Sequence, residues 1–590
     1  MSIDIETYRL KAQEAIEYVF VKEYHNSLGI PMPIVKMLLP DDANYSTGQY
    51  YITIDKTWQI HLNFGKLPIS YHEFQNEVKV LTRHEIEHYM CCPFDVITHF
   101  RMLKRIRDVY YKHFSHLGIN IEYACGAISN QAADIIVDTK NYYRHSKETL
   151  KSEIDWIKIG ANISACPRHC KLMFLTKEAI WKEDLGINET DPEFLKIVHQ
   201  LADSFTKNGI EDKSSFLDKV EEYAEIFFKL YVEDQKNPQQ SSQQGSQQQS
   251  GQQGPQQQNG QQGSQQQRGQ QGPQQQSGQQ GSQQQSGQWG VGRPKDGDEH
   301  GNAFVFADPD KVKEAIEVLA EETSVEEFID LLAIAGIIGM SDKQKGVLWF
   351  NVQSANIIPI VEFSNTGNKS SYTYPSVWRI GDPIEELDLM LTYMTSPRLI
   401  PGMTTKKWGY VSNDDNGTES KQMDLLLVVD TSGSMGSAMK ESANMHQAVL
   451  ASYGILSYFE STKSKVAFIG FSDKIDAYVD WSDKYDDVRE RLLTNGHGGT
   501  KFPISRIKST LDVRSRDLVT VLITNGDLGN INESVSYFRD YLNDDNKLYI
   551  FLLGGSKSLH SYEPLKNIGA KIYNANNANE FCDMVLTDME

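Results

Sequence analysis

Two histidines one helical turn apart, with a glutamate beside the first, are the residues of this sequence best suited to metal chemistry. They are His84, Glu85 and His88 in the run His-Glu-Ile-Glu-His. Side chains at positions i and i+4 of a helix share one face, so both imidazoles can reach one tetrahedral zinc ion. Glu85 then lies near a water bound to that ion and can act as general base. The spacing predicts a hydrolytic zinc site; the alternative is an amphipathic helix that carries two histidines by chance.

A third zinc ligand is expected from a second helix, because a catalytic zinc ion has three protein ligands and one open position. The run from Asn130 to Asp138 has a helical pattern, in which Asn130, Asp134 and Asp138 recur at i, i+4 and i+8 on one stripe. One of these three residues should be the ligand. The competing interpretation is a solvated polar face, whereas the neighbouring Ala132 and Ala133 indicate close helix packing.

Two strands followed by a long helix are expected to position the histidines. Residues Tyr50–Ile54 and Gln59–Asn63 alternate as strands do, with a short turn between them, and Tyr71–Met90 has a helical pattern. An edge strand beside a metal-binding helix can hold an extended polypeptide substrate by strand addition.

These two elements, HExxH and a later Asn-x-Ala-x-Asp helix, resemble the metallopeptidase-type domain of prokaryotic proteins that also carry a von Willebrand factor A-like domain. The resemblance is at the level of motifs and covers residues 1–235. It implies a zincin-like fold in which His84 and His88 bind Zn²⁺ and Glu85 is the catalytic base. It also implies Asp134 as the third ligand, with Asp138 as the alternative.

A second set of oxygen-bearing side chains follows the apolar run Asp424–Asp430. Asp430, Ser432 and Ser434 come at the end of this run, and a buried parallel strand that ends in clustered oxygens is typical of a ligand site. Their Asp-x-Ser-x-Ser pattern is similar to the start of the metal-ion-dependent adhesion site (MIDAS) of von Willebrand A domains. That similarity implies Thr500 as a further ligand, and oxygen ligands suit Mg²⁺.

The last part of the MIDAS pattern departs from the family. The apolar run Leu518–Thr524 is followed by Asn525, where the family has an aspartate, and then by Asp527. Asn525 can still orient a water, and Asp527 can supply a carboxylate. The alternative is the same fold with a degenerate site.

Alternating strands and helices predict that residues 411–590 form a doubly wound α/β domain of the von Willebrand A type. The expected strands beyond the first are Lys465–Phe471, Leu518–Thr524, Lys547–Leu553 and Ala570–Tyr573, with a helix over Lys484–Leu493.

Residues 236–294 are expected to be a disordered linker. From Gly245 a nonapeptide of Gly, Gln, Ser and Pro recurs, of the type GSQQQSGQQ. A calcium-binding β-roll would need Asp and an aliphatic residue in each repeat, and both are missing. Almost nothing in the repeat can be buried, so a flexible tether is predicted, with a self-associating Gln-rich tract as the alternative.

Residues 295–410 are expected to be an extension without a chemical interpretation. The pattern predicts helices over Asp308–Gly346 and a strand- and loop-rich segment over Val347–Tyr410.

Composition excludes some partners and compartments. The net charge of −21 argues against nucleic acid or an anionic membrane as the main partner. No apolar run reaches transmembrane length and no signal peptide is visible, so a cytoplasmic location is expected. The six cysteines are expected to be buried thiols, although Cys166, His169 and Cys170, with Cys91 or Cys92, are conceivable ligands of a second zinc ion.

The sequence therefore predicts a multidomain α+β and α/β protein, in which a zinc metallopeptidase is tethered to a magnesium-binding docking domain. Proteins of the architecture it resembles imply a MoxR-type AAA+ ATPase, or its client, as the partner of the A domain. One alternative is a non-catalytic adaptor with a structural zinc ion. Another is a chelatase-like metal-insertion subunit, which has no need of HExxH.

Overall fold

The structure is a computed structural model of the 590-residue chain. It divides into two compact units, Met1–Ala315 and Ile316–Glu590, each with its own hydrophobic core. The described residues are 5–25, 28, 32–38, 50–54, 59–64, 70–159, 163–236, 309–337, 340–355, 376–377, 387–388, 406–407, 423–514, 517–526, 528, 530–544, 546–554 and 559–575. The Gln-rich repeat expected to be a linker lies outside them.

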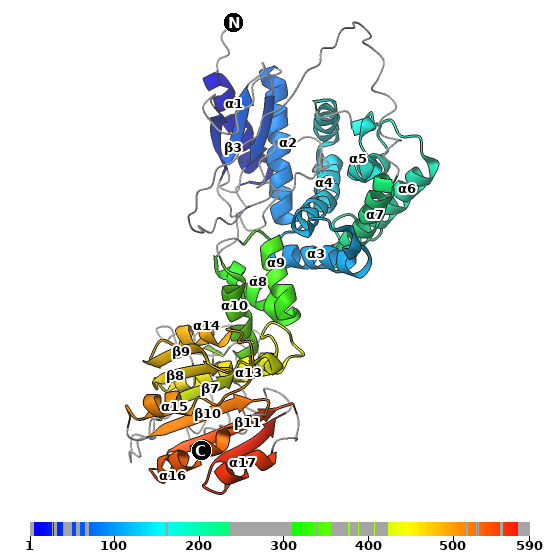
Figure 1. Cartoon of the computed structure of the whole chain (residues 1–590). Helices are drawn as coiled ribbons and strands as arrows, with labels where there is room; N and C mark the ends of the chain where they lie inside the picture. The colour runs from blue at the N-terminus through cyan, green and yellow to red at the C-terminus, as the bar shows by residue number, and fades with distance from the viewer. Residues whose placement is uncertain are drawn as a thin grey trace, which may run out of the picture. The chain divides into compact units, whose positions relative to one another are not determined.

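The first unit begins with a helix and a small sheet that share one core (Figure 1). Helix α1 (Ile5–Glu17) is followed by strands β1 (Ile34–Leu38), β2 (Tyr50–Ile54) and β3 (Gln59–Phe64) in the order β1-β3-β2. Strand β1 runs parallel to β3, and β2 runs antiparallel to it. Ile60 and Leu62 of β3 are fully buried, as expected for a strand with one face against a core. The β2–β3 pair confirms the two predicted strands, whereas β1 was not predicted.

Helix α2 (Tyr71–Met90) carries the HExxH motif and has the bounds expected from the sequence. Its start is fixed by a capping box, in which the Ser70 side chain accepts from the Glu73 amide and the Glu73 carboxylate accepts from the Ser70 amide. Phe74, Val78 and Ile86 bury one face of the helix against α1 and β3. The histidines consequently lie in the last two turns of a helix that is held firmly at its start.

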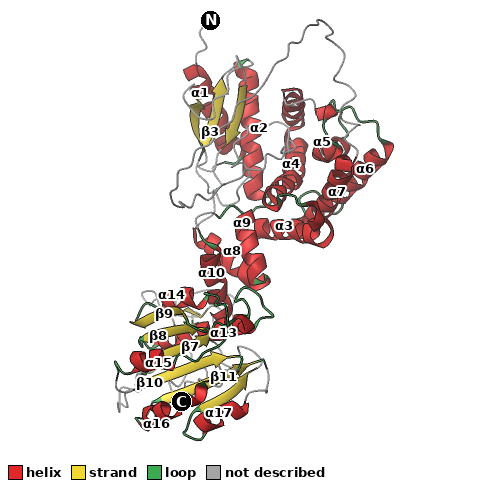
Figure 2. Cartoon of the chain, in the orientation of Figure 1, coloured by secondary structure: helices red, strands yellow, loops and turns green. Residues whose placement is uncertain are grey.

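Five further helices follow α2 in the first unit, between residues 96 and 236 (Figure 2). They are α3 (Val96–Val109), α4 (Ile121–Ile159), α5 (Arg168–Trp181), α6 (Pro192–Thr206) and α7 (Phe216–Lys236). The first unit also contains short segments of 3-10 or π helix, at Tyr18–Glu23, Tyr110–Phe114, Ser115–Leu117, Ile163–Ala165 and Lys213–Ser215. Helix α4 packs against α2, α3, α5 and α7 and is kinked at His145. Ala132 and Ala133 are buried in this packing, which agrees with close helix contact. None of the described helices is apolar over a length that would cross a bilayer.

The second unit contains a mixed six-stranded sheet in the order β12-β11-β10-β7-β8-β9. Its strands are β7 (Asp424–Asp430), β8 (Val466–Phe471), β9 (Ile475–Ser482), β10 (Leu518–Thr524), β11 (Lys547–Leu553) and β12 (Lys571–Ala575). All neighbours are parallel except β8 and β9. Helices lie on both faces of the sheet (Figure 1): α13 (Asn444–Ser461), α14 (Tyr485–Leu492), α15 (Ile504–Leu511), α16 (Val535–Asn543) and α17 (Leu559–Lys566). The unit is therefore an α/β domain, as predicted.

The strand order places the loop after β7 and the loop after β10 side by side. Strand β7 pairs with β10 in a register that sets Val429 opposite Ile523, so Asp430 and Thr524 end neighbouring strands at the same edge. Because the chain order of the strands reverses between β7 and β10, this edge is the topological switch point where doubly wound sheets bind ligands.

Between α7 and this sheet, the described part of the chain contains the helices α8 (Pro309–Glu322), α9 (Val325–Ile334) and α10 (Asp342–Ala355). Helix α10 packs against α9, α13 and α14, and its Trp349 and Phe350 rings contact His446 on α13. The helices expected over Asp308–Gly346 are present, but α10 continues through residue 355. The prediction of a strand- and loop-rich segment from Val347 onward is therefore wrong for residues Val347–Ala355. Two-residue strands follow at Ser376–Val377 (β4), Leu387–Asp388 (β5) and Lys406–Lys407 (β6), paired antiparallel.

Candidate metal centre

Three potential ligand atoms converge between α2 and α4. The Nε2 atoms of His84 and His88 lie 3.1 Å apart, and Oδ1 of Asp134 lies 3.6 Å and 3.2 Å from them respectively. A tetrahedral zinc ion with bonds of about 2.0–2.1 Å needs ligand atoms roughly 3.3–3.4 Å apart. The triangle therefore has the dimensions of one face of such a coordination shell. The three side chains are 11–14% exposed.

The tautomers of both histidines are set by the atoms behind them. His84 Nδ1 lies 2.7 Å from Asp138 Oδ1, and His88 Nδ1 lies 2.9 Å from the Cys92 carbonyl oxygen. Because a carboxylate and a carbonyl oxygen only accept, each Nδ1 must donate, and each neutral imidazole therefore directs an Nε2 lone pair toward the centre. Asp134 Oδ1 is buried there without a hydrogen bond from the described residues. Three such atoms that face one another can share a proton or a metal cation, so these residues fit a divalent metal ion once the proton is displaced.

The electrostatics of the cluster favour a positive charge at this point. Burial by itself lowers the pKa of His84, but the carboxylates of Asp138 and Asp134 outweigh burial and raise that pKa to about 9. Burial raises the pKa of Asp138, whereas Lys177 and His84 lower it by more, so its carboxyl group has a pKa below the usual range. The C-terminal end of α2, where both histidines lie, also carries the negative end of the helix dipole. A metal ion that binds here must displace a proton from His84.

The three polar residues on the stripe of α4 have different places in the centre. Asp134 directs Oδ1 to the two Nε2 atoms and accepts with Oδ2 from the Asn130 amide at 3.0 Å. Asp138 lies behind His84 and contacts its Nδ1. The choice between Asp134 and Asp138 that the residues alone left open thus has a geometric answer: only Asp134 belongs to the group of atoms that could hold an ion.

The two glutamates of the motif have different surroundings. Glu85 is half-buried, and no described residue forms a hydrogen bond or ion pair with its carboxylate. Glu87 is fully buried and is bound by Lys140 at 2.8 Å, Arg144 at 3.0 Å and the Tyr24 hydroxyl at 3.0 Å. Glu85 is therefore the glutamate whose carboxylate is available for chemistry, and Glu87 ties α2 to α4 and to the segment after α1.

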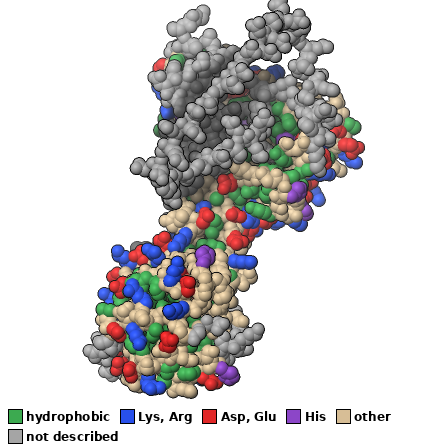
Figure 3. Space-filling view, viewed as in Figure 1, with side chains coloured by type: hydrophobic (Ala, Val, Ile, Leu, Met, Phe, Trp, Pro, Cys, Tyr) green, Lys and Arg blue, Asp and Glu red, His purple; other side chains and the backbone are tan. Residues whose placement is uncertain are grey.

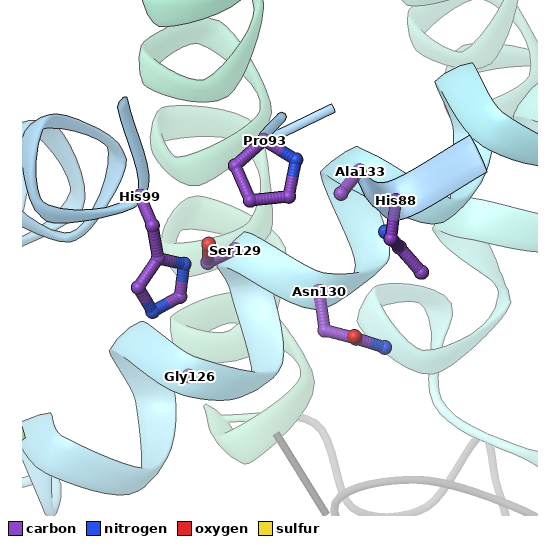
Figure 4. A pocket seen from close by; sticks show the side chains of 7 residues that line it. All are labelled: His88, Pro93, His99, Gly126, Ser129, Asn130 and Ala133. Atoms are coloured by element: carbon purple, nitrogen blue, oxygen red, sulfur yellow. The ribbon is translucent and has the colours of Figure 1, made fainter. Parts of the chain in front are cut away.

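A small pocket adjoins His88 on the side of α3 (Figure 4). Its lining consists of His88, Pro93, His99, Gly126, Ser129, Asn130 and Ala133, of which the last four come from one face of α4. Its free volume of about 10 Å³ corresponds to roughly one water molecule. The small side chains of α4 leave this space beside a metal-facing histidine.

The second unit brings together four of the residues expected to form a magnesium site. Asp430 Oδ1 accepts from the Ser432 amide at 2.9 Å, and its Oδ2 accepts from the Thr524 hydroxyl at 2.7 Å. The hydroxyl oxygens of Ser432 and Ser434 are 3.0 Å apart, and the Asn525 amide donates to Ser434 at 2.7 Å. These oxygen atoms cluster at the switch point of the sheet.

Two other residues expected at this site are less defined. Thr500 is half-buried in the loop whose Gly498 carbonyl oxygen lies 3.4 Å from the Gly433 amide nitrogen, so its loop touches the Asp430 loop. Asp527 lies outside the described residues. Asp430 is thus the one described carboxylate among the six expected residues, and Asn525 contributes an amide where the family pattern has an acid.

The cysteines do not gather around a second metal in the part of the chain that the structure describes. There, His84, His88 and Asp134 are the one group of His, Cys, Asp or Glu residues with converging ligand atoms. His169 Nδ1 pairs with Asp234 at 2.8 Å, and burial raises the pKa of the Cys170 thiol to about 12 and that of Cys91 to about 11. The described cysteines are accordingly thiols, mostly buried, while Cys582 lies outside the described residues.

Comparisons with known proteins do not assign this chain to a family. No family model matches it, and no curated protein matches it. Among solved structures, the conserved hypothetical protein BatB from Bacteroides thetaiotaomicron aligns with 12% identity and a TM-score of 0.24, over 28% of this chain and 97% of that one. An uncharacterized membrane spanning protein from Vibrio fischeri aligns with 18% identity and a TM-score of 0.13, over 28% of this chain and 96% of that one. Structural similarity with such low TM-scores is no evidence of a shared function, so a functional proposal has to be based on the geometry of the site.

Proposed function

We propose that the first unit is a zinc-dependent metallopeptidase whose ion is held by His84, His88 and Asp134. The observation that carries this proposal is the convergence of two Nε2 lone pairs and an unpartnered carboxylate oxygen at tetrahedral spacing. Three ligands leave the fourth position open, which distinguishes catalytic zinc sites from closed structural ones.

The residues around the ligands have complementary tasks in peptide hydrolysis. A zinc ion bound there would polarise the scissile carbonyl group and lower the pKa of the attacking water. Glu85 follows His84 on α2 and accepts the proton of that water, then delivers it to the leaving amine. Asp138 and the Cys92 carbonyl oxygen hold the two imidazoles in the tautomer that directs Nε2 to the ion. The pocket beside His88 has room for roughly one water molecule.

The second unit is proposed to recruit a partner through Mg²⁺ at Asp430, Ser432 and Ser434. Oxygen ligands at a switch point, with a coordination position left for a carboxylate of the partner, make docking dependent on the ion. The resemblance noted above implies a MoxR-type AAA+ ATPase or its client as that partner. Figure 3 shows acidic and basic side chains interspersed over the visible face of this unit, so that face offers no broad single-sign surface.

Metal analysis beside a proteolysis assay tests the peptidase. His84→Ala should lose most of its zinc, whereas His72→Ala, an exposed histidine at the start of the same helix, should keep it. Glu85→Gln should keep zinc and lose hydrolysis of an unfolded protein substrate by roughly 10²-fold or more, because a general base contributes about that much. Stoichiometric zinc in His84→Ala would place the site elsewhere. Equal cleavage by wild type and Glu85→Gln would rule out the proposed base, and zinc without cleavage in either would favour an adaptor.

A further inference from the structure

A lysine is buried behind the candidate metal centre. Lys177 on α5 is 2% exposed, and its Nζ lies 2.5 Å from Asp138 Oδ2 and 3.0 Å from Glu153 Oε1. A buried ammonium group is costly unless it is paired, and a chain retains one mainly where its charge is used. Packing does not explain the lysine, because an apolar side chain of similar length would fill the same space at lower cost.

Lys177 completes a chain of contacts that begins at a metal-facing imidazole. His84 Nδ1 donates to Oδ1 of Asp138, and Lys177 donates to Oδ2 of the same carboxylate. Both oxygens of Asp138 are thereby engaged from opposite sides, which leaves the carboxylate one orientation. Glu153 holds the ammonium group from its other side. Since Asp138 precedes the kink of α4 at His145 and Glu153 follows it, Lys177 also joins the two halves of that helix.

The cluster contains more carboxyl groups than lysines. Asp134, Asp138 and Glu153 supply three carboxyl groups, whereas Lys177 is paired with only two of them, Asp138 and Glu153. Lys177 therefore leaves the Asp134 carboxyl group to the two histidines.

We propose that Lys177 is a positioning residue of the metal centre: it fixes Asp138 against His84 so that His84 directs Nε2 to the ion. The inference rests on the metal site of the proposed function but not on peptidase activity. Lys177 is not one of the three candidate ligands, and it acts on the centre through Asp138. Loss of Lys177 frees Asp138 to rotate, and the His84 imidazole then has no fixed orientation.

A pure charge effect would have the opposite sign, which makes the test sharp. If Lys177 acted only as a positive charge near a cation, Lys177→Met would tighten metal binding and Glu153→Gln, which removes a negative charge, would weaken it. A positioning role predicts a different pattern, in which only the lysine substitution has a large effect. Lys177→Met should weaken zinc binding by roughly 10- to 100-fold, the usual effect of losing a partner of a metal-binding histidine. Glu153→Gln keeps an oxygen acceptor for Lys177 and should change the zinc affinity by less than about threefold.

The experiment measures Zn²⁺ affinity of the full chain by competition with a chromophoric chelator, and the visible spectrum of the Co²⁺ form as a report on ligand geometry. Asp138→Asn and the double variant Asp138→Asn/Lys177→Met complete a thermodynamic cycle. If Lys177 acts through Asp138, the two single effects will not add in the double variant. Zinc binding by Lys177→Met as tight as wild type, or additive effects in the cycle, would overturn the proposal.

Folding failure of Lys177→Met does not remove the test. Adding Glu153→Gln to the double variant replaces the whole buried charged group by two amides and an apolar side chain, a change that folded proteins commonly tolerate. Because no lysine fixes residue 138 in this triple variant, it should bind zinc more weakly than wild type and change the shape of the Co²⁺ spectrum. Wild-type zinc affinity with an unchanged spectrum in the triple variant would contradict the proposal. A wild-type protein that binds zinc but cleaves nothing would refute the peptidase and leave this inference standing.

Discussion

The two glutamates of the motif should respond in opposite ways to the same substitution, glutamate to glutamine. Glu87 is fully buried and bound by Lys140, Arg144 and Tyr24, whereas Glu85 is half-buried without a described partner. Glu87→Gln should therefore destabilise the first unit and spare the chemistry of correctly folded molecules. Glu85→Gln should abolish hydrolysis and leave stability unchanged. The pair is a matched control, because both substitutions are isosteric and lie two residues apart on α2.

The size of the Glu87 effect follows from its surroundings. Removing one partner of a buried ion pair costs about 3–5 kcal/mol because the other charge stays buried. Lys140 is 7% exposed but retains Glu211 at 3.2 Å, and Arg144 is 48% exposed and can be solvated. The low end of the range therefore applies, about 3 kcal/mol. For a unit of this size that corresponds to a fall in Tm of roughly 6–12 °C. An isosteric change at a half-exposed site without partners stays within about 0.5 kcal/mol.

Thermal unfolding of the full chain, followed by calorimetry, measures both variants. The transition of the first unit is recognised as the one that a zinc-selective chelator shifts in the presence of excess Mg²⁺. A Tm for Glu87→Gln within about 2 °C of wild type would refute the reasoning from burial. A fall for Glu85→Gln as large as that for Glu87→Gln would show that Glu85 is a structural residue and not an available base.

Three further outcomes are expected. The pKa of His84 is about 9 in the folded protein against an ordinary value of 6.5, so its proton stabilises the metal-free fold fully below pH 6.5, and this stabilisation is lost as the pH rises through about 9. Zinc must displace this proton, so the zinc affinity measured by competition titration should rise up to tenfold per pH unit between about pH 7 and 9 and then level off. A zinc affinity that does not change with pH in this range would contradict the raised pKa. Asn525→Asp should tighten Mg²⁺ binding at the second site, measured by titration calorimetry, because a carboxylate replaces the amide that donates to Ser434; unchanged heats would mean that Asn525 does not face the ion. Asp430→Ala, or EDTA, should abolish capture of the cognate ATPase while the circular dichroism spectrum is unchanged, and undiminished capture would exclude docking through the metal.

Local patterns predicted the elements of the first site well. The helical pattern of Tyr71–Met90 gives the bounds of α2, and two histidines at i and i+4 necessarily share a face. The choice of Asp134 over Asp138 is different, because it depends on how α4 crosses α2. No spacing within α4 contains that information. Lys177 could not be found from the sequence at all, since it comes from a third helix and lysine is ordinarily exposed.

The errors in the fold have physical reasons as well. The stretch Val347–Phe350 is apolar and contains Trp349, and a short buried apolar run does not distinguish a helix from a strand. Its helical state comes from packing of α10 on α13. Strand β9 was missed although its residues alternate, with Ala477 buried, because it is an antiparallel edge strand in a sheet expected to be parallel. Strand β1 is flanked by Pro33 and Pro40, but it pairs in parallel with β3, from which β2 separates it in the chain, and no local pattern predicts such a pairing.

The division of the metal centre between two helices has a consequence for how this protein can vary in evolution. Both imidazoles belong to α2, and both carboxylates that face them belong to α4. Each pair is therefore a rigid body, and a single inserted residue within either helix near the site would rotate one pair by about 100° and carry it away from the other. Insertions and deletions in homologues should accordingly be confined to the loops between these helices, where they leave both pairs in phase. Homologues with an insertion or deletion inside either helix near the site should no longer bind the metal ion.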